Sequence, residues 1–338
     1  MDYKNAGVDI EAGEKAVQGI KGLVKQTYNS NVLSELGSFG GLYRLDLTRW
    51  KEPVMVASTD GVGTKLLVAQ MADRYDTIGQ DLVNHCVNDI FVQGAVPQFF
   101  MDYIGVAKMD SDMIQLIISG MTKACTENQM SLLGGEIAEM PGIYHNKDFD
   151  VVGTIVGLVE KSDIITGESI CEGDVIIGFY STGLHTNGYS LARKIIFEKM
   201  QLKINDYVRE IDQTVAEALL SVHKSYYPLL KGFSTPEYIH GMAHITGGGL
   251  KGNIKRVIPK HLCAVIDYNS WETPALFNWM TDNGNVAFDD ALSAFNMGIG
   301  FVVIAPMSKA DEILKETGGV KIGEISKNDI GESVIINC

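Results

Sequence analysis

The chain has 338 residues, of which 46% are hydrophobic and 21% charged, and at roughly 100 to 200 residues per domain this predicts a folded protein of two domains. The net charge of -14 repels nucleic acid and anionic membranes, so neither is an expected partner. Because the same charge repels ATP, a nucleotide site here must supply metal ions, backbone N–H groups or a few placed cations.

Three further features concern the cellular compartment. The first residues, MDYKNAG, lack the apolar run of a secretory signal. The uncharged stretch between Asp290 and Lys309 contains Gly298, Gly300 and Pro306, so we expect strand and turn there and no membrane span. The five cysteines are an odd number and form no C-x-x-C pair, which favours reduced thiols and a cytoplasmic location.

Strands and helices alternate through the first half. Apolar residues at helical spacing, such as Leu82, Cys86 and Ile90, predict one helix, and Asp110 or Ser111 is a suitable cap for the next. The expected elements are a strand over 53–58, a helix over 77–91, a strand over 99–106, a helix over 110–128, a strand over 131–133 and a strand over 149–159.

A polar break, EKSD over 160–163, separates the two halves. We therefore expect an N-terminal domain over 1–163 and a C-terminal domain over 164–338. The second half is expected to contain a strand over 174–179, helices over about 188–200 and 216–230, a strand, loop and helix start over 239–250, and strands over 263–266 and 300–305. The alternation in both halves predicts an α/β or α+β fold.

The segment over 58–65 reads STDGVGTK and is the most informative. Asp60 directly follows a buried strand, and a carboxylate there suits a hard cation such as Mg²⁺. The spacing is not that of a Walker A loop, and a β-turn with a solvated aspartate and lysine is the alternative interpretation. The groups that could meet a phosphate are the backbone N–H groups of Gly61, Gly63 and Thr64 and the ammonium group of Lys65.

The helix over 77–91 has a polar face. Asp81, Asn84 and Asn88 recur three and four residues apart, opposite the apolar face, and Asp89 lies beside them. A solvated face is one interpretation. The absence of Lys and Arg over 77–107 favours the other, a wall of metal ligands.

A third acidic segment reads GGEIAEMPG over 134–142. Two glycines and Glu136 follow a strand here, as around Asp60. We expect Asp60, Asp89 and Glu136 to converge at strand ends of one domain, where α/β sheets bind ligands. Three such acids need a metal ion to offset their repulsion.

Glycine-rich loops follow. In STGLHTNGYS over 181–190, a strand leads through a loop into a helix start, and His185 could transfer a proton there or serve a structural role. Gly247, Gly248 and Gly249 form a candidate phosphate cradle, although such runs are also common turns. Near the N-terminus, GSFGG over 37–41 could be a mobile flap over a nucleotide or a linker.

Together these segments resemble the AIR synthetase family of the PurM-like superfamily. Eight stretches match in register, from residue 3 to about 300, and this is far more specific than any single match. They read YKNAGVDI from Tyr3, IKGLVK from Ile20, STDGVGTK from Ser58, DTIGQDLVNHCVNDIFVQGA from Asp76, GGEIAEMPGIYH from Gly134, GLHTNGYSLARKI from Gly183, AHITGGGLKGNIKRVIP from Ala243 and FNMGIG from Phe295.

The resemblance implies a reaction and a fold. The reaction closes the imidazole ring of 5-aminoimidazole ribonucleotide from formylglycinamidine ribonucleotide, with ATP and Mg²⁺, and releases ADP and phosphate. ATP is expected to phosphorylate the formyl amide oxygen before ring closure. The fold has two α/β domains, and the N-terminal sheets of two copies form a barrel across a homodimer.

The resemblance also implies roles for individual residues. Mg²⁺–ATP would be held by Asp60, Asp89 and Glu136, and the phosphates would contact Gly61, Gly63, Thr64 and Lys65. Lys21 and Asn88 would lie near the nucleotide. His185, as proton-transfer group, and Asn187 would line the active site, and a phosphate, such as the ribose phosphate, would bind at Gly247, Gly248 and Gly249.

Other ATP-using members of the superfamily are alternatives. A selenophosphate synthetase needs a reactive cysteine near the N-terminus, whereas the first here is Cys86. A thiamine-monophosphate kinase shares the acidic pattern but not the GLHTNGYS or GGEIAEMPG segments. A hydrogenase-maturation relative ends in Pro-Arg-Ile and a cysteine, and Cys338 lacks that context. A non-catalytic nucleotide-binding subunit is a further alternative. The presence of the three acids and His185 argues against it, because such a subunit would not need them.

Overall fold

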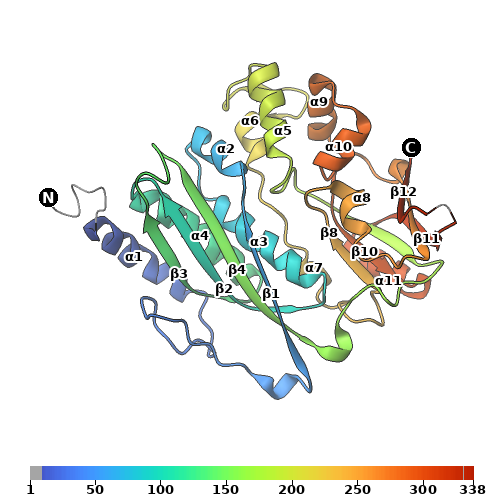
Figure 1. The fold of residues 1–338 in the computed structure, drawn as a ribbon, viewed down its shortest axis with the longest axis horizontal. Helices are drawn as coiled ribbons and strands as arrows, with labels where there is room; N and C mark the ends of the chain where they lie inside the picture. Colours follow the sequence, from blue (N-terminus) through green and yellow to red (C-terminus); the bar gives the residue numbers. More distant parts are fainter. Residues whose placement is uncertain (1–9, 330) are drawn as a thin grey trace. The chain divides into compact units, whose positions relative to one another are not determined.

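The computed structural model describes residues 10–329 and 331–338, which divide into two compact units. The first unit runs up to Ile90 and from Ala95 to Glu160, and the second contains Phe91–Gly94 and everything from Lys161 onward. The main crossing from one unit to the other thus lies within the polar EKSD segment, whereas the short excursion after Ile90 has no sequence signal that we detected. Each unit has its own large sheet (Figure 1).

A mixed four-stranded sheet, in the order β1-β4-β2-β3, organises the first unit. β4 pairs antiparallel with β1 and β2, whereas β2 and β3 are parallel. The strands are β1 (Pro53–Gly61), β2 (Val96–Val106), β3 (Ser131–Glu139) and β4 (Phe149–Glu160). The helices are α1 (Ile10–Lys25), α2 (Lys65–Ala72), α3 (Ile78–Phe91) and α4 (Ser111–Glu127), with a 3₁₀ turn at Leu47–Arg49.

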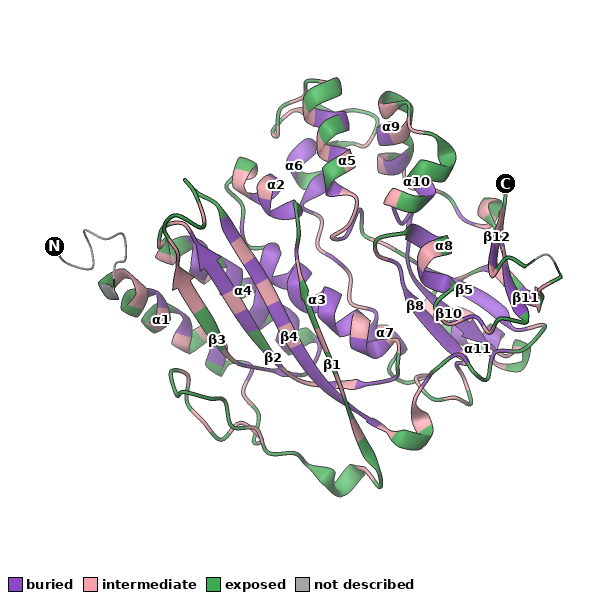
Figure 2. Cartoon of the chain, viewed as in Figure 1, coloured by how far each residue is buried: buried purple, intermediate pink, exposed green. Residues whose placement is uncertain are grey.

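Within the described residues of this unit, helices cover one face of the sheet. In Figure 1, α3 and α4 lie behind the strands, and Figure 2 shows α3 buried along nearly its whole length. The two helices approach to backbone contact, because a Cβ atom on Gly79 would lie 2.0 Å from the carbonyl oxygen of Ile117 and one on Gly120 would lie 2.6 Å from that of Asp76. The helix-facing residues of β2, such as Phe100 and Ile104, are fully buried.

The expected elements of this unit agree in type with the observed ones, the expected strands are too short, and α1 and α2 were not expected. Asp110 does cap α4, since its side chain accepts hydrogen bonds from the backbone N–H groups of Asp112 and Met113. β3 continues through Gly134, Gly135 and Glu136, where we expected the strand to stop at Leu133. The glycines did not end the strand because their backbone stays paired with β2.

The second unit contains a six-stranded sheet in the order β12-β9-β11-β5-β10-β8. Its strands are β5 (Val175–Tyr180), β8 (Gly241–His244), β9 (Leu262–Asp267), β10 (Ile299–Ala305), β11 (Val320–Lys327) and β12 (Val334–Asn337), and β6 (Tyr207–Val208) and β7 (Gln213–Thr214) form a separate hairpin. The helices are α5 (Tyr189–Arg193), which continues as a π-helix over Lys194–Lys199, α6 (Val215–Leu219), α7 (Tyr227–Leu230), α8 (Gly249–Ile254), α9 (Ala275–Gly284), α10 (Phe288–Ala294) and α11 (Met307–Thr317), with 3₁₀ turns at Lys161–Asp163 and Tyr268–Ser270.

The predicted helix over 216–230 is wrong. The structure has two short helices there, α6 and α7, separated by an irregular segment. Pro228 lies in the first turn of α7, where its missing N–H group is tolerated, but it cannot continue a helix from α6. Each of the two short helices buries apolar residues of its own, such as Leu219 in α6 and Leu230 in α7.

The core of the second unit is aliphatic. Buried residues of β5, β8 and β10, such as Ile176, Ala243 and Val302, pack with Ile254 of α8 and with Ile322 of β11. Among the described residues, no helix is both long enough and apolar enough to cross a bilayer.

Candidate active site

Asp60, His85 and Asp89 form a compact group in the first unit. His85 Nε2 lies 2.7 Å from Asp60 Oδ2 and 3.5 Å from Asp89 Oδ2. One ligand atom from each of the three residues lies within 4.8 Å of the others, which is close enough to surround one metal ion. The structure thus brings together two of the three carboxylates that the sequence predicted.

Local structure fixes this group. Asp60 is the penultimate residue of β1, and the backbone N–H of Gly61 donates a 2.7 Å hydrogen bond to its Oδ1. His85 and Asp89 are four residues apart on α3, so they share one face of the helix. The Ser58 hydroxyl lies 3.5 Å from Asp89 Oδ2 and links β1 to the helix.

His85 was not predicted, although its spacing from Asp89 was a usable signal. Burial alone would lower the pKa of its imidazole, because the charged form is desolvated. The hydrogen bond to Asp60 and the charge of Asp89 outweigh burial and leave the pKa above its ordinary value. The imidazole is therefore a partial counter-charge for the two acids.

The donor set fits a hard divalent cation. The side chains of Asp60 and Asp89 are 47% and 25% exposed, so solvent and a ligand can complete a coordination shell. Because Mg²⁺ prefers oxygen ligands, the carboxylates are its natural contacts, and His85 suits the role of a hydrogen-bond partner that orients Asp60.

Glu136 does not join this group within one copy of the chain. Asp60, Gly153, Asp102 and Gly135 occupy one cross-strand row, and Glu136 is the next residue along β3. β1 and β3 are the two edges of the sheet, three strand spacings or about 14 Å apart. The expected convergence of three carboxylates is therefore seen only for Asp60 and Asp89.

The structure does not support the expected role of Lys65 as a phosphate contact. Its side chain is fully buried, and Nζ lies 2.8 Å from Oδ2 of the equally buried Asp81. A lysine in this position cannot present its charge to a phosphate at the surface of the loop. Burial lowers its pKa, and Asp81 opposes that shift.

The polar face of α3 is buried, so neither sequence interpretation describes it fully. Asp81 is committed to Lys65, and Asn84 accepts a 3.0 Å hydrogen bond from the side chain of Asn128 at the end of α4. Asn88 is fully buried as well. Only Asp89 and His85, nearer the end of the helix, remain with the candidate metal group.

The glycine loop after β1 is accessible. Gly63 and Thr64 are exposed, and Gly63 has a φ of 67°, which a residue with a side chain rarely adopts. Both residues line a hollow of about 260 Å³ that also contains Asp148 and Asp150. A phosphate in this hollow would meet backbone groups and acids, so it would need a cation to accompany it.

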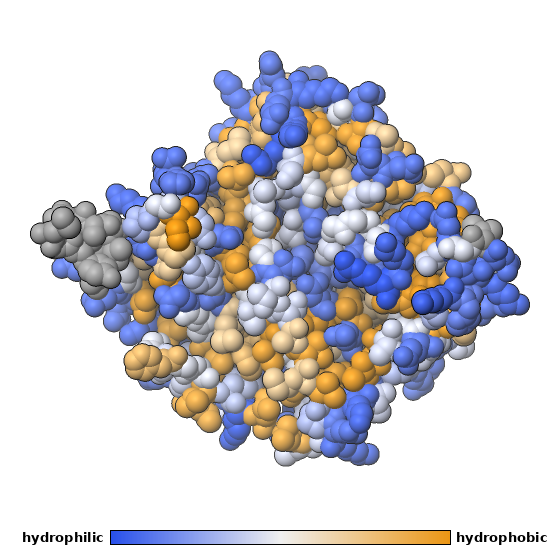
Figure 3. All heavy atoms as spheres, in the orientation of Figure 1, coloured by the Kyte–Doolittle hydropathy of each residue, from blue (hydrophilic) through white to orange (hydrophobic). Residues whose placement is uncertain are grey.

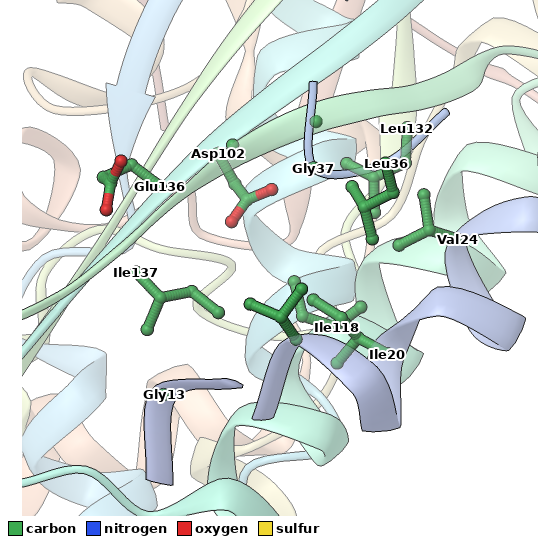
Figure 4. Close-up of a pocket in the computed structure, with 13 residues that line it drawn as sticks. Gly13, Ile20, Val24, Leu36, Gly37, Asp102, Ile118, Leu132, Glu136 and Ile137 are labelled. Atoms are coloured by element: carbon green, nitrogen blue, oxygen red, sulfur yellow. The ribbon is translucent and has the colours of Figure 1, made fainter. Parts of the chain in front are cut away.

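A second hollow, of about 220 Å³, lies between α1 and β3 (Figure 4). Its apolar lining includes Val17, Ile20 and Ile118. It is also bordered by Leu36 and by Gly37, the first residue of the GSFGG segment. Figure 4 shows the carboxylate of Asp102 directed into this space. The hollow also includes backbone of β3 up to Glu136 and Ile137.

Asp102 is the unusual group in this hollow. It is only 9% exposed, and burial raises the pKa of its carboxyl group to about 7. The sequence placed it inside a strand and gave no reason to single it out. Lys21, predicted to lie near the nucleotide, is half buried on α1 next to Ile20.

In the second unit, His185 lies beneath its loop. It is 1% exposed with a φ of 60°, its ring stacks on His223 at 4.0 Å, and its Nε2 accepts a 3.3 Å hydrogen bond from the backbone N–H of Thr182. These contacts hold the loop in shape. They do not present the imidazole to solvent, as direct proton transfer would require.

Asn187 and the three glycines do come together. A Cβ atom on Gly247 would lie 3.5 Å from Asn187 Oδ1. The Asn253 side chain donates to the carbonyl oxygens of Thr246, Gly247 and Gly249, and so fixes the loop from beneath.

Two amides of this glycine run are already engaged. Gly248 N–H donates to Ser293 O and Gly249 N–H to Thr246 O, at 3.2 and 3.0 Å. Fewer backbone N–H groups of this run are therefore available to a phosphate than the sequence suggested.

Family models match most of the chain. The N-terminal domain of AIR synthase related proteins matches residues 43–159, and the C-terminal domain of the same family matches residues 172–336. The phosphoribosylformylglycinamidine cyclo-ligase of Alkaliphilus oremlandii is 47% identical over 311 residues, covering 92% of this chain and 91% of the relative.

The corresponding enzyme of Geotalea uraniireducens is 46% identical over 340 residues and covers 99% of this chain and 98% of its own. Among solved structures, the thiamine-monophosphate kinase of Stenotrophomonas maltophilia has a TM-score of 0.68 at 14% identity and covers 94% of this chain and 96% of its own, a likeness of fold alone. On these matches, the chain belongs to the AIR synthase related family, with both of its domains.

Proposed function

We propose that this chain is a phosphoribosylformylglycinamidine cyclo-ligase of purine biosynthesis, acting in the cytoplasm. It converts formylglycinamidine ribonucleotide and ATP into 5-aminoimidazole ribonucleotide, ADP and phosphate. The observation that carries the proposal is the near-full-length identity to cyclo-ligases, 46–47%. The acid group at the end of β1 and the two glycine loops supply groups of the kind that an ATP-dependent reaction needs.

The chemistry requires activation of an amide. The formyl amide oxygen attacks the γ-phosphorus of ATP and ADP leaves, which turns a poor leaving group into a good one. An amidine nitrogen then attacks the activated carbon, phosphate leaves and a proton is lost, so the ring closes. Phosphoryl transfer of this kind depends mainly on positioning and on neutralising charge.

Asp60 and Asp89 are the proposed Mg²⁺ ligands, and His85 orients Asp60. When bound, Mg²⁺ neutralises phosphate charge and so offsets the negative field of the chain. The backbone of Gly61, Gly63 and Thr64 lies next to this group and would contact the phosphates.

Around this core we place the other predicted residues. Lys21, Glu136 and the hollow of Figure 4 form a second place where part of the nucleotide could bind. Asn187 and Gly247–Gly249 remain proposed contacts for the substrate phosphate. His185 is proposed as a positioning residue for this loop, because its ring is buried. Asn88, which is buried beside Asp89, is proposed to support that carboxylate.

We further propose a homodimer in which the N-terminal sheets of two copies form a barrel. Helices cover one face of the four-stranded sheet, and the other face carries exposed residues such as Met55 and Met101. The segment before β1 adds exposed Leu33, Leu42 and Leu47, and Figure 3 shows apolar side chains gathered in the lower part of that view. Exposed apolar surface of this extent is typical of an interface.

A dimer would also give Glu136 a way to join the metal group. β1 and β3 are edge strands, so each is free to pair with a second copy. Asp60 of one copy would then lie near Glu136 of the partner subunit. Mixing homodimers of Asp60→Asn with homodimers of Glu136→Gln tests this arrangement, because half of the sites in a mixed dimer would be intact.

If the site is shared, the mixture regains about a quarter of wild-type activity, whereas neither parent is active. If each copy holds a complete site, every site carries one defect and activity stays at the level of the parents. Size-exclusion chromatography with light scattering confirms that each variant remains a dimer.

The function itself is tested with the purified chain, formylglycinamidine ribonucleotide, ATP and Mg²⁺. The proposal predicts formation of the aminoimidazole product with one ADP per turnover, and no ADP release without the substrate. Phosphorylation of thiamine monophosphate, or transfer to selenide, with no aminoimidazole formed would establish one of the alternative activities of the superfamily.

A further inference from the structure

A cluster of Cys171, Asp174 and His240 lies in the second unit and has no part in the proposed reaction. The Cys171 thiol donates a 3.3 Å hydrogen bond to Asp174 Oδ1, and His240 Nδ1 lies 2.7 Å from Asp174 Oδ2. One ligand atom from each residue lies within 4.8 Å of the other two. Sulfur, nitrogen and oxygen donors thus meet at one point.

The fold explains why these residues meet. Asp174 directly precedes β5 and His240 directly precedes β8, and both strands pair antiparallel with β10, which lies between them. The two residues therefore start two parallel strands, one on each side of β10, at the same end of the sheet. The backbone supports this position, because His240 N–H donates to Ile304 O and Ile325 N–H donates to Asp174 O.

A tight turn adds the thiol. The Asp174 N–H donates to Cys171 O at 3.2 Å, and Gly173 has a φ of 90°, as the third residue of a type II turn requires. The Cys171 N–H in turn donates to Asp174 Oδ2 at 2.9 Å. Two ligands separated by two residues on a turn, with a third from a distant strand, is a spacing familiar from zinc sites.

We propose that Cys171, Asp174 and His240 bind a borderline divalent cation of the zinc class. A zinc ion replaces the S–H proton that now joins Cys171 to Asp174, so one proton is released, and the imidazole binds in its neutral form with its proton on the other nitrogen. Mg²⁺ and Ca²⁺ are poor candidates because they prefer all-oxygen shells.

Burial and exposure support a site with one open position. Asp174 is 2% exposed, whereas Cys171 is exposed at the surface, so an ion can enter from the thiol side and keep a water or other ligand there. A coordinating thiol is deprotonated outright, and its sulfur, bound to the ion, is then shielded from reagents in solution.

The structural alternative is that Asp174 only stabilises its turn and the start of β8. This alternative predicts no change at the thiol when zinc is added. The two interpretations can be separated on the intact chain, because Cys338 offers an exposed thiol outside the cluster as an internal control.

The experiment is N-ethylmaleimide labelling of full-length protein, freed of metal with a chelator, with and without Zn²⁺ and with excess Mg²⁺ to occupy oxygen sites. Peptide mass spectrometry follows Cys171 and Cys338 separately. At a zinc concentration about ten times the dissociation constant, labelling of Cys171 should slow about tenfold while that of Cys338 is unchanged.

Two variants sharpen the result. His240→Gln should lose the protection of Cys171, whereas His261→Gln, a histidine outside the cluster, should keep it. Co²⁺ should give a thiolate charge-transfer band in the wild type and in Cys338→Ser that is absent in Cys171→Ser. Cyclo-ligase turnover of Cys171→Ser and His240→Gln should match the wild type, which also shows that they fold.

Equal labelling of Cys171 with and without zinc would overturn the site. Full protection of Cys171 in His240→Gln would show that His240 is not a ligand, and it would overturn the three-ligand assignment. Neither result depends on cyclo-ligase activity, so the cation site and the proposed function can fail separately.

Discussion

Asp81 and Asp89 lie about two turns apart on α3 and have opposite environments. Asp81 is fully buried and its charge is matched by Lys65 at 2.8 Å. Asp89 is a quarter exposed and shares one imidazole with Asp60, so negative charge is in excess there. The difference shows that a carboxylate marks a candidate metal site where it shares its counter-charge with a second acid and reaches solvent.

The largest expected effect comes from breaking the buried pair. Lys65→Met removes the cation that lies 2.8 Å from the buried Asp81 carboxylate and should cost about 3–5 kcal/mol of unfolding free energy. Urea denaturation measures this. The double variant Lys65→Met/Asp81→Leu should recover most of the loss, because a buried pair replaced by apolar side chains is often neutral. A single variant as stable as the wild type would show that the pair is not desolvated.

The group of Asp60, His85 and Asp89 should respond in activity and not in stability. Asp60→Asn is expected to lower kcat by about 100-fold or more, because it removes a proposed ligand of the Mg²⁺ ion that would neutralise the transferring phosphoryl group. Its denaturation midpoint should match the wild type, since Asp60 is half exposed. Asp112→Asn, an exposed acid on α4, is the control and should retain full turnover. Unchanged turnover in Asp60→Asn would remove this residue from the site.

A smaller effect is expected at His85. His85→Ala removes the group that orients Asp60. It should raise the Mg²⁺ concentration needed for half-maximal turnover about 10–100-fold, as with other partners of metal ligands. His85→Gln can still donate a hydrogen bond and should lose less. Turnover measured against Mg²⁺ concentration separates the two variants. Equal loss in both would indicate that the imidazole itself acts in the reaction.

The smallest effect, when taken per pH unit, concerns Asp102, a third carboxylate with yet another environment. Its pKa of about 7 in the folded chain lies above the ordinary value of 3.8, so the folded state binds more protons between these values. Stability should therefore fall as pH rises through this window, by up to about 1.4 kcal/mol per pH unit, and the loss is complete above pH 7. Asp102→Asn should remove this slope. Denaturation midpoints from pH 4 to 8 measure it, and identical slopes in both proteins would contradict the shift.

The sequence predicted all four strands of the first sheet and the helices α3 and α4, because these carry clear periodicity, but it gave no expectation for α1, α9, α11, β11 or β12. It failed where chain geometry depends on distant partners. β3 runs through two glycines because β2 pairs with them, and the helix expected over 216–230 is interrupted before Pro228.

The candidate site was predicted only in part, because local sequence signals identify some of its residues and contacts between distant residues decide the others. Asp60 and Asp89 each lie at the end of an element, and a local signal was enough to place them. Lys65 faces inward because α2 begins there, and no local pattern distinguishes a buried lysine from a phosphate contact. Asp102 and the Cys171 cluster depend on what packs around them, which only the fold supplies.

The most direct test of the contrast between the buried Lys65–Asp81 pair and the partly exposed group of Asp60, His85 and Asp89 is Mn²⁺ binding, followed by electron paramagnetic resonance with a non-hydrolysable ATP analogue present. Mn²⁺ suits carboxylate sites and serves as a spin probe in place of Mg²⁺. We expect the wild type and Asp112→Asn to bind the ion alike, and Asp60→Asn and Asp89→Asn to lose it. Undiminished binding in both of the latter variants would contradict the assignment of this group as the metal site.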